Sequence, residues 1–194
     1  MQSRSQTAGV SGISTKDMVY IGIFAALMAI CSWISIPTAV PFTLQTFAVF
    51  LACLVLGGKR GTIAVLVYIL LGCVGLPVFS GFKGGPGVLL GATGGYILGF
   101  IGTALVLWAL EKRYRGSTVK TILSLVLGLL VCYALGTAWF MRVYAGANGP
   151  VSLMTTLGWC VFPFIVPDLI KIALAFLAAP MIRRGAGLPP YASV

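Results

Sequence analysis

Long apolar runs, separated by short charged or glycine-rich segments, are the feature that most restricts what this chain can fold into. Apolar side chains make up 59% of the 194 residues and charged side chains only 8%, whereas a soluble domain carries about 25% charged residues. The mean hydropathy is +1.06. This composition predicts an integral membrane protein. Each crossing of a bilayer needs about 20 apolar residues, so the chain has room for one helical bundle and little else.

Six apolar runs predict six transmembrane helices. The runs cover residues 18–36, 44–56, 62–74, about 91–110, 121–141 and about 157–182. The second and third runs are shorter than a standard span, so residues 44–74 form either two full crossings or a short tilted hairpin. We therefore predict an all-α membrane bundle over residues 18–184, with tails at residues 1–17 and 185–194.

The connecting segments carry the glycine, the proline and much of the charge. A charged turn, Gly57–Gly61, joins the two short runs. Residues 75–95 are so rich in glycine that no regular helix is expected there. Residues 37–43, 76–90 and 142–156 are predicted to form three loops on the same side of the bundle.

Basic residues predict the orientation of this bundle. With six crossings and the N-terminus inside, ten Lys and Arg residues fall on the cytoplasmic side, and only Lys83 and Arg142 fall on the outer side. Cytoplasmic segments of membrane proteins carry an excess of Lys and Arg, so both termini are predicted to be cytoplasmic. Because the net charge of +10 is scattered between apolar runs, it does not indicate binding to nucleic acid.

Asp168 and Lys171 are the candidate binding residues. They lie three positions apart within the last apolar run, where charged side chains are costly and normally mark a binding site or an ion path. On a helix they share nearly one face, so they can neutralise each other, hold a polar ligand together, or do both. A helix starting at Leu157 places them about 16–21 Å along it, near mid-membrane. A helix starting nearer Pro163 or Pro167 instead places Asp168 at its outer end, where the helix dipole stabilises a carboxylate.

Several kinds of chemistry are not expected. The chain has no His, which is the commonest metal ligand and the usual acid–base group near neutral pH. Its five cysteines lack the spacing of metal ligands, and no nucleotide-binding loop is present. Asp168 has no neighbouring carboxylate in the sequence, since Asp17 and Glu111 flank spans on the cytoplasmic side. We therefore predict no catalytic residue, no metal and no cofactor.

Three stretches of the chain carry a recognisable pattern: Val40–Thr46, Gly75–Phe82 with its continuation Gly91–Tyr96, and Pro167–Lys171. Together they resemble the BioY family, the biotin-binding S components of energy-coupling factor (ECF) vitamin transporters. The resemblance covers nearly the whole chain after the N-terminal tail. It implies six membrane helices in the cytoplasmic (inner) membrane of a prokaryote. Biotin would be the transported ligand, captured from outside, and a transmembrane coupling subunit and two ATPase subunits would be the partners.

The resemblance also implies roles for individual residues. The expected biotin-binding residues are Asp168, Lys171, Phe79, Ser80, Gly81, Tyr96, Thr43 and Gln45. We assign Asp168 to the ureido N–H groups of biotin and Lys171 to its polar part. Ala25 and Ala29 lie in a small-xxx-small pattern, which permits close helix packing, and the resemblance makes them the expected contact with the coupling subunit.

Other functions remain as alternatives at this point. The chain could be an S component for another vitamin, a solitary carrier, an intramembrane enzyme that uses Asp168, or a structural subunit in which the ion pair only orders the bundle. The sequence also leaves open whether the chain acts alone, as a homo-oligomer, or only with coupling subunits.

Overall fold

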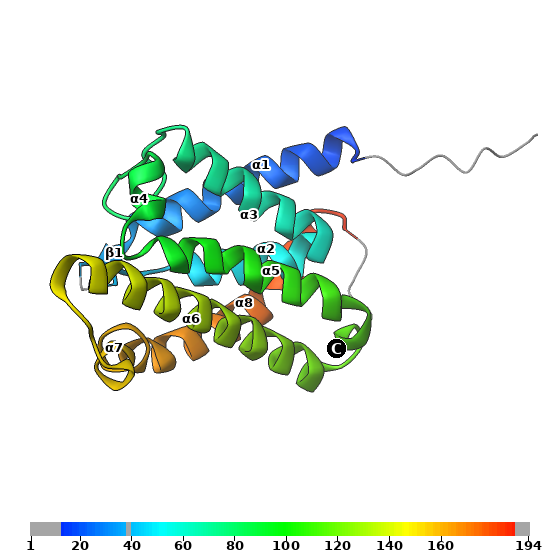
Figure 1. The fold of residues 1–194 in the computed structure, drawn as a ribbon. Helices are drawn as coiled ribbons and strands as arrows, with labels where there is room; N and C mark the ends of the chain where they lie inside the picture. Colours follow the sequence, from blue (N-terminus) through cyan, green and yellow to red (C-terminus); the bar gives the residue numbers. More distant parts are fainter. Residues whose placement is uncertain (1–12, 38–39, 189–194) are drawn as a thin grey trace, which may run out of the picture.

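A computed structural model describes residues 13–37 and 40–188 of the chain, and the described part is mainly helical (Figure 1). Its helices are α1 (Thr15–Trp33), α2 (Gln45–Leu56), α3 (Gly58–Cys73), α4 (Pro86–Leu90), α5 (Gly94–Tyr114), α6 (Thr118–Asn148), α7 (Leu153–Cys160) and α8 (Phe162–Gly185). Two short strands, β1 (Ser35–Ile36) and β2 (Phe42–Thr43), pair antiparallel. Within the described ranges, α1, α5, α6 and α8 are long and apolar enough to cross a membrane. This confirms an apolar helical membrane protein.

The first helix begins earlier and ends earlier than the apolar run predicts. Ser14 caps it: its Oγ accepts from the amide of Asp17 at 3.1 Å, and the Asp17 carboxylate accepts from the amide of Ser14 at 3.1 Å. This reciprocal pair satisfies amides that have no partner inside the helix. At the other end, α1 stops at Trp33 and the chain becomes extended, because Pro37 disfavours a helical conformation just before it.

The predicted charged turn between the two short runs is reduced to one residue. Gly57 has a φ of 85°, a conformation that glycine adopts without steric cost. Lys59 and Arg60 therefore lie in the first turn of α3 rather than in a loop. The backbone amide of Gly58 donates to the Glu111 carboxylate at 3.2 Å, which ties the start of α3 to the end of α5.

Three sequence-based boundaries are wrong. Residues 75–95 contain one short helix, α4, which starts at Pro86 because proline suits the first turn of a helix. The predicted loop at 142–156 is mostly helical, since α6 continues to Asn148 and α7 starts at Leu153. The last crossing does not begin at Leu157. That residue belongs to α7, and the helix breaks at Val161 before α8 starts.

The connections of the bundle gather at two opposite ends (Figure 1). One end carries residues 34–37 and 40–44 and the segments 74–93 and 149–161. The other end carries the start of α1, the junction of α2 and α3, the connection from α5 to α6, and the end of α8. We call these the loop end and the basic end.

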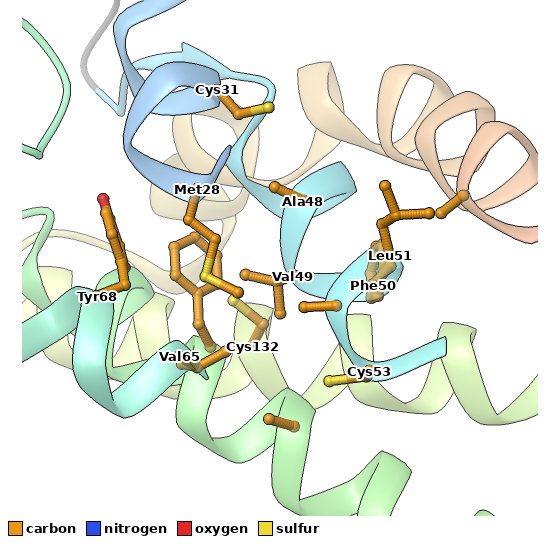
Figure 2. Packing of buried hydrophobic residues seen from close by; sticks show 14 of the residues in the cluster. Met28, Cys31, Ala48, Val49, Phe50, Leu51, Cys53, Val65, Tyr68 and Cys132 are labelled. Atoms are coloured by element: carbon orange, nitrogen blue, oxygen red, sulfur yellow. The ribbon is translucent and has the colours of Figure 1, made fainter. Parts of the chain in front are cut away.

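Helix α2 forms the centre of the bundle, and ten of its residues are buried. It packs against α1, α3, α5 and α8, and a helix that is apolar on all sides is expected in such a position. Figure 2 shows Val49 of α2 beside Met28 of α1 and Val65 of α3. Arg183 of α8 is also buried and donates to the carbonyls of Leu54 and Val55, which lack helical partners at the end of α2.

Candidate functional site

A cavity of about 260 Å³ lies at the loop end of the bundle. Its wall comes from the segment before α2, from α2 itself, from the loop before α4, and from α5, α6, α7 and α8. Seven of the eight predicted ligand residues line it: Thr43, Gln45, Phe79, Ser80, Tyr96, Asp168 and Lys171. The eighth, Gly81, is not among the lining residues. It lies in the adjacent turn with a φ of 71°, where a residue with a side chain would be strained.

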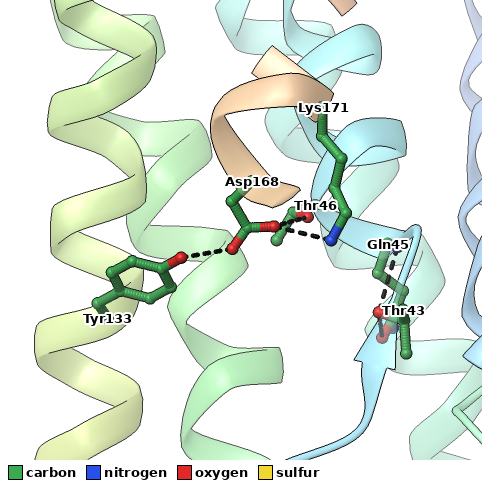
Figure 3. Close-up of polar contacts among 6 residues, drawn as sticks. All are labelled: Thr43, Gln45, Thr46, Tyr133, Asp168 and Lys171. Carbon is green, nitrogen blue, oxygen red and sulfur yellow. Dashed lines mark hydrogen bonds and ion pairs between the residues drawn. The ribbon is translucent and has the colours of Figure 1, made fainter. Parts of the chain in front are cut away.

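Asp168 and Lys171 form an ion pair in the wall of this cavity. The Lys171 Nζ lies 2.8 Å from the Asp168 Oδ1, and the two residues are only 2% and 4% exposed. Thr46 of α2 donates to the same oxygen at 2.9 Å, and Tyr133 of α6 donates to Oδ2 at 2.5 Å. Figure 3 shows the carboxylate between the tyrosine on one side and the threonine and lysine on the other. Buried charges need this kind of pairing, because an isolated one is strongly disfavoured.

The start of α8, where Pro163 lies, determines how far along the helix Asp168 is. The helix begins at Phe162 with Pro163 in its first turn, where proline costs little because its amide needs no partner. Asp168 is the seventh residue, about 9 Å from the start of the helix. Of the two predicted placements, the one near the helix N-terminus is therefore correct. The dipole contribution is small beyond the first turn, so the polar partners dominate the stabilisation of the carboxylate.

Lys171 also contacts an aromatic ring. Its Nζ lies 4.3 Å from the centre of the Phe42 ring, a distance at which a cation is attracted to the ring face. Phe42 in turn stacks on Phe164, with ring centres 5.8 Å apart. The ammonium group is thus held between a carboxylate and an aromatic face.

A second polar group on the cavity wall is Gln45, and its side chain is fixed by two neighbours. The Thr43 hydroxyl donates to its Oε1 at 3.1 Å, and its own Nε2 donates to the Tyr68 hydroxyl. Tyr68 then donates to the carbonyl of Val78 at 3.1 Å. The amide of Gln45 is therefore oriented before any ligand arrives.

Aromatic rings form the apolar part of the wall. Phe79 is 1% exposed and meets the Tyr68 ring edge to face, with centres 5.6 Å apart. Its ring lies against Gly72, where an added Cβ would be 2.1 Å from the ring. Tyr96 lines the cavity from α5, and its hydroxyl lies 3.2 Å from the Thr137 hydroxyl. These rings suit a small ligand with an apolar body.

Three functional candidates were missed in the sequence: Thr46, Tyr133 and Lys83, all of which line the cavity. Thr46 lies in the quoted stretch Val40–Thr46, so the stretch itself was the available signal. Tyr133 is a single hydroxyl inside an apolar helix, and only the approach of α6 to α8 reveals its partner. Lys83 was assigned to an outer loop but not to the site.

The structure corrects the predicted partner surface on α1. Ala25 and Ala29 are 1% and 6% exposed and pack inside the bundle, so they are not available to another subunit. Gly22 and Ala26, also small and four residues apart, lie on the exposed face of the same helix. The small-xxx-small pattern is present, but its outward-facing pair lies three positions before the predicted one.

Comparisons with known proteins identify the family and the fold. The sequence model of the BioY family matches residues 2–187. A biotin transporter BioY from Thermotoga maritima is 44% identical over 170 residues, which cover 87% of this chain and 96% of that protein. A probable biotin transporter BioY from Pyrococcus horikoshii is 40% identical over 172 residues, which cover 88% of this chain and 98% of that protein. A crystal structure of the S-component for biotin from an ECF-type ABC transporter superposes with a TM-score of 0.76 at 29% identity, and the match covers 91% of this chain and 93% of that one.

Proposed function

The chain belongs to the BioY family, and from this premise we propose that it captures biotin in the cavity at its loop end as the S component of an ECF transporter. The observation that carries the proposal is the buried pair of Asp168 and Lys171 in the cavity wall. A membrane protein retains such a pair at a cost, and in general it does so for function. The family is one of transporter components, so the chain is not an enzyme.

The chemistry of biotin fits the wall of the cavity. Biotin has two ureido N–H donors, an apolar thiophane ring and chain, and a carboxylate. A carboxylate offers about four acceptor positions. Three positions on Asp168 are taken by Thr46, Tyr133 and Lys171, so a ureido N–H group can add to Oδ2 without displacing a protein donor. Lys171 then lies beside the polar ring, and Phe79 and Tyr96 cover the apolar part.

Titration of biotin into the purified protein tests this assignment. We expect tight binding of one biotin per chain, measured as heat in an isothermal titration. Other vitamins added under the same conditions serve as controls and are expected to give no saturable heat. A stronger response to a different vitamin would overturn the choice of biotin while leaving the site in place.

Lys83 is proposed to bind the carboxylate of biotin. It lines the cavity from the loop before α4 and is solvent exposed, so it can meet the charged end of a ligand whose ureido ring lies at Asp168. A charge-assisted hydrogen bond contributes about 1.5–3 kcal/mol, so Lys83→Gln should weaken biotin binding about tenfold or more.

Binding of a biotin amide, which lacks the negative charge of biotin, tests the same interaction from the side of the ligand. The wild type should bind it about tenfold more weakly than biotin, and Lys83→Gln should bind both ligands alike, since the two changes remove one interaction. Arg142→Gln is the control, because Arg142 is a basic residue at the loop end that does not line the cavity. Equal preference for biotin over its amide in wild type and Lys83→Gln would refute the role of Lys83.

We propose six crossings, with α2 and α3 as the two short ones. Their 12 and 16 residues span about 18 and 24 Å, against a hydrocarbon core of about 30 Å. Of the basic residues in the described ranges, nine lie at the basic end, Lys83 and Arg142 lie in the half of the bundle toward the loop end, and Lys171 is buried inside the bundle. Arg4, the tenth residue assigned to the cytoplasmic side, lies outside the described residues. The positive-inside rule then supports cytoplasmic termini and an outward cavity. From the family membership we propose residence in the inner membrane of a prokaryote.

The transport partners are proposed to be a transmembrane coupling subunit and two ATPase subunits. The bundle is proposed to act as one substrate-binding unit over residues 18–184. Residues 1–12 and 189–194 of the two predicted tails lie outside the described residues. The exposed face of α1 around Gly22 and Ala26 is the surface on which another helix can approach closely. This replaces Ala25 and Ala29 as the expected contact with the coupling subunit.

A further inference from the structure

A tight hairpin before α4 forms one wall of the cavity. Phe79 and Lys83 pair through two backbone hydrogen bonds of 2.9 and 3.3 Å. Phe79, Ser80 and Lys83 all line the cavity. The position of this hairpin therefore determines the shape of the cavity and the position of two of its polar groups.

The tip of the hairpin has an unfavourable backbone conformation. Gly81 and Phe82 both have positive φ, 71° and 55°. Glycine tolerates this region, but a bulky residue such as phenylalanine rarely adopts it unless its surroundings hold it there. In the described ranges Phe82 is the only residue other than glycine with a positive φ. Something outside the hairpin must therefore compensate for this conformation.

The last two residues of α1 supply that support. The Trp33 ring stacks on the Phe82 ring, with centres 5.1 Å apart and planes at 24°. The Trp33 Nε1 donates to the carbonyl of Pro77 at 2.8 Å, and the Ser32 Oγ donates to the carbonyl of Val78 at 2.6 Å. Trp33 thus holds the hairpin at two points, its base and its tip, from outside the cavity.

We propose that Trp33 is a positioning residue for ligand retention, which clasps the hairpin against the bundle and so keeps the cavity wall closed over bound ligand. This rests on the proposed function. Because the hairpin forms one wall of the cavity, a movement of the hairpin away from the bundle opens the cavity, and such a movement breaks the contacts of Trp33. Since α1 also carries the exposed Gly22 and Ala26, a displacement of α1 by a docked subunit acts directly on the hairpin.

The test measures the rate at which biotin dissociates from purified protein in detergent. Trp33→Ala removes both contacts, and we expect dissociation about tenfold faster from the loss of one hydrogen bond and one ring stack. Trp33→Phe keeps a ring but loses the N–H donor, so its effect should be smaller, about threefold. Phe82→Ala loses only the ring stack and keeps the hydrogen bond to Pro77, so its effect should also be about threefold. The double variant should be no faster than Trp33→Ala alone, because both changes break the same stack.

A second measurement does not depend on biotin. In the ligand-free protein, the hydrogen-bonded amides of Phe79 and Lys83 should exchange with deuterium faster in Trp33→Ala than in the wild type. Trp108→Ala is the matched control, since Trp108 is 43% exposed, compared with 37% for Trp33, and packs on Gly58 in α3. It should change neither the exchange nor the dissociation rate.

These outcomes distinguish a failure of the proposed role of Trp33, which we call the clasp, from a failure of the proposed function. Unchanged dissociation and unchanged exchange in folded Trp33→Ala would overturn the clasp, even if biotin binds tightly. A wild type that does not bind biotin would overturn the proposed function, while the exchange measurement would still decide on the clasp. If Trp33→Ala does not fold, Trp33→Phe and Phe82→Ala give the same two readouts and decide the question.

Discussion

Replacing Asp168 by asparagine is expected to weaken biotin binding at least about a hundredfold. The change removes the charged acceptor proposed for the ureido N–H group, and truncating one partner of a buried, hydrogen-bonded charge in a complex costs about 2–5 kcal/mol, of which about 3 kcal/mol already corresponds to a hundredfold. The new amide nitrogen also replaces one of the two acceptor oxygens, so its N–H groups oppose either Tyr133 or the pair Thr46 and Lys171, all of which donate to Asp168. Isothermal titration of biotin against the wild type and this variant measures the loss.

Two further variants show whether this loss concerns the ligand or only the fold. Asp17→Asn makes the same chemical change at the basic end, where Asp17 pairs with Arg60 at 2.9 Å, and biotin binding should be unaffected. Asp168→Asn combined with Lys171→Gln removes both buried charges. We expect it to be more stable to heat than Asp168→Asn alone, because no unpaired charge remains, yet still unable to bind biotin tightly. Equal binding heats for wild type and Asp168→Asn would contradict the site.

Replacing Gly58 by alanine is expected to cause a large loss of stability. The added Cβ would lie 2.3 Å from the Cα and 2.9 Å from the amide nitrogen of Trp108 in α5. These are backbone atoms, which cannot rotate away, so α3 and α5 must move apart. Overpacking of this kind costs about 1–3 kcal/mol, and we expect the thermal midpoint in detergent to fall by several degrees.

Gly22→Ala is the control, and it is not expected to lower the thermal midpoint. No atom lies within 4 Å of the Cβ that would be added at Gly22, and alanine is the better helix former by up to about 1 kcal/mol. The thermal midpoint should therefore stay the same or rise. If Gly58→Ala unfolded at the same temperature as Gly22→Ala, the close packing of α3 on α5 would be refuted.

The existence of the helices could be predicted from the sequence, but several of their ends could not. Long apolar runs become helices in a bilayer because the backbone must satisfy its own hydrogen bonds there. Where a helix stops depends on neighbours. α6 continues past Arg142 into a region where Tyr144 stacks on Phe140 and packs on Trp159 of α7. That support comes from a segment that follows later in the chain, so the local sequence gave no sign of it.

The surface of α1 also shows what the sequence can predict and what only the packing reveals. The sequence showed a run of small residues but not which of them face outward. In a membrane, the side of a helix that meets lipid is as apolar as the side that meets the core, so hydropathy does not distinguish Ala25 from Ala26. The packing of α1 against α2 and α3 settled that Ala25 is inside.

The sequence by itself determined that this is an apolar helical membrane protein, and it singled out Asp168 and Lys171 as candidate binding residues because charge within an apolar run is costly. Only the tertiary structure decided what surrounds them. Thr46, Tyr133 and Asp168 come from α2, α6 and α8, and the hydrogen bonds between them form only where these helices meet. The physical reason is that the cost of burying a charge belongs to the residue itself, whereas its compensation depends on neighbours that are distant in the chain.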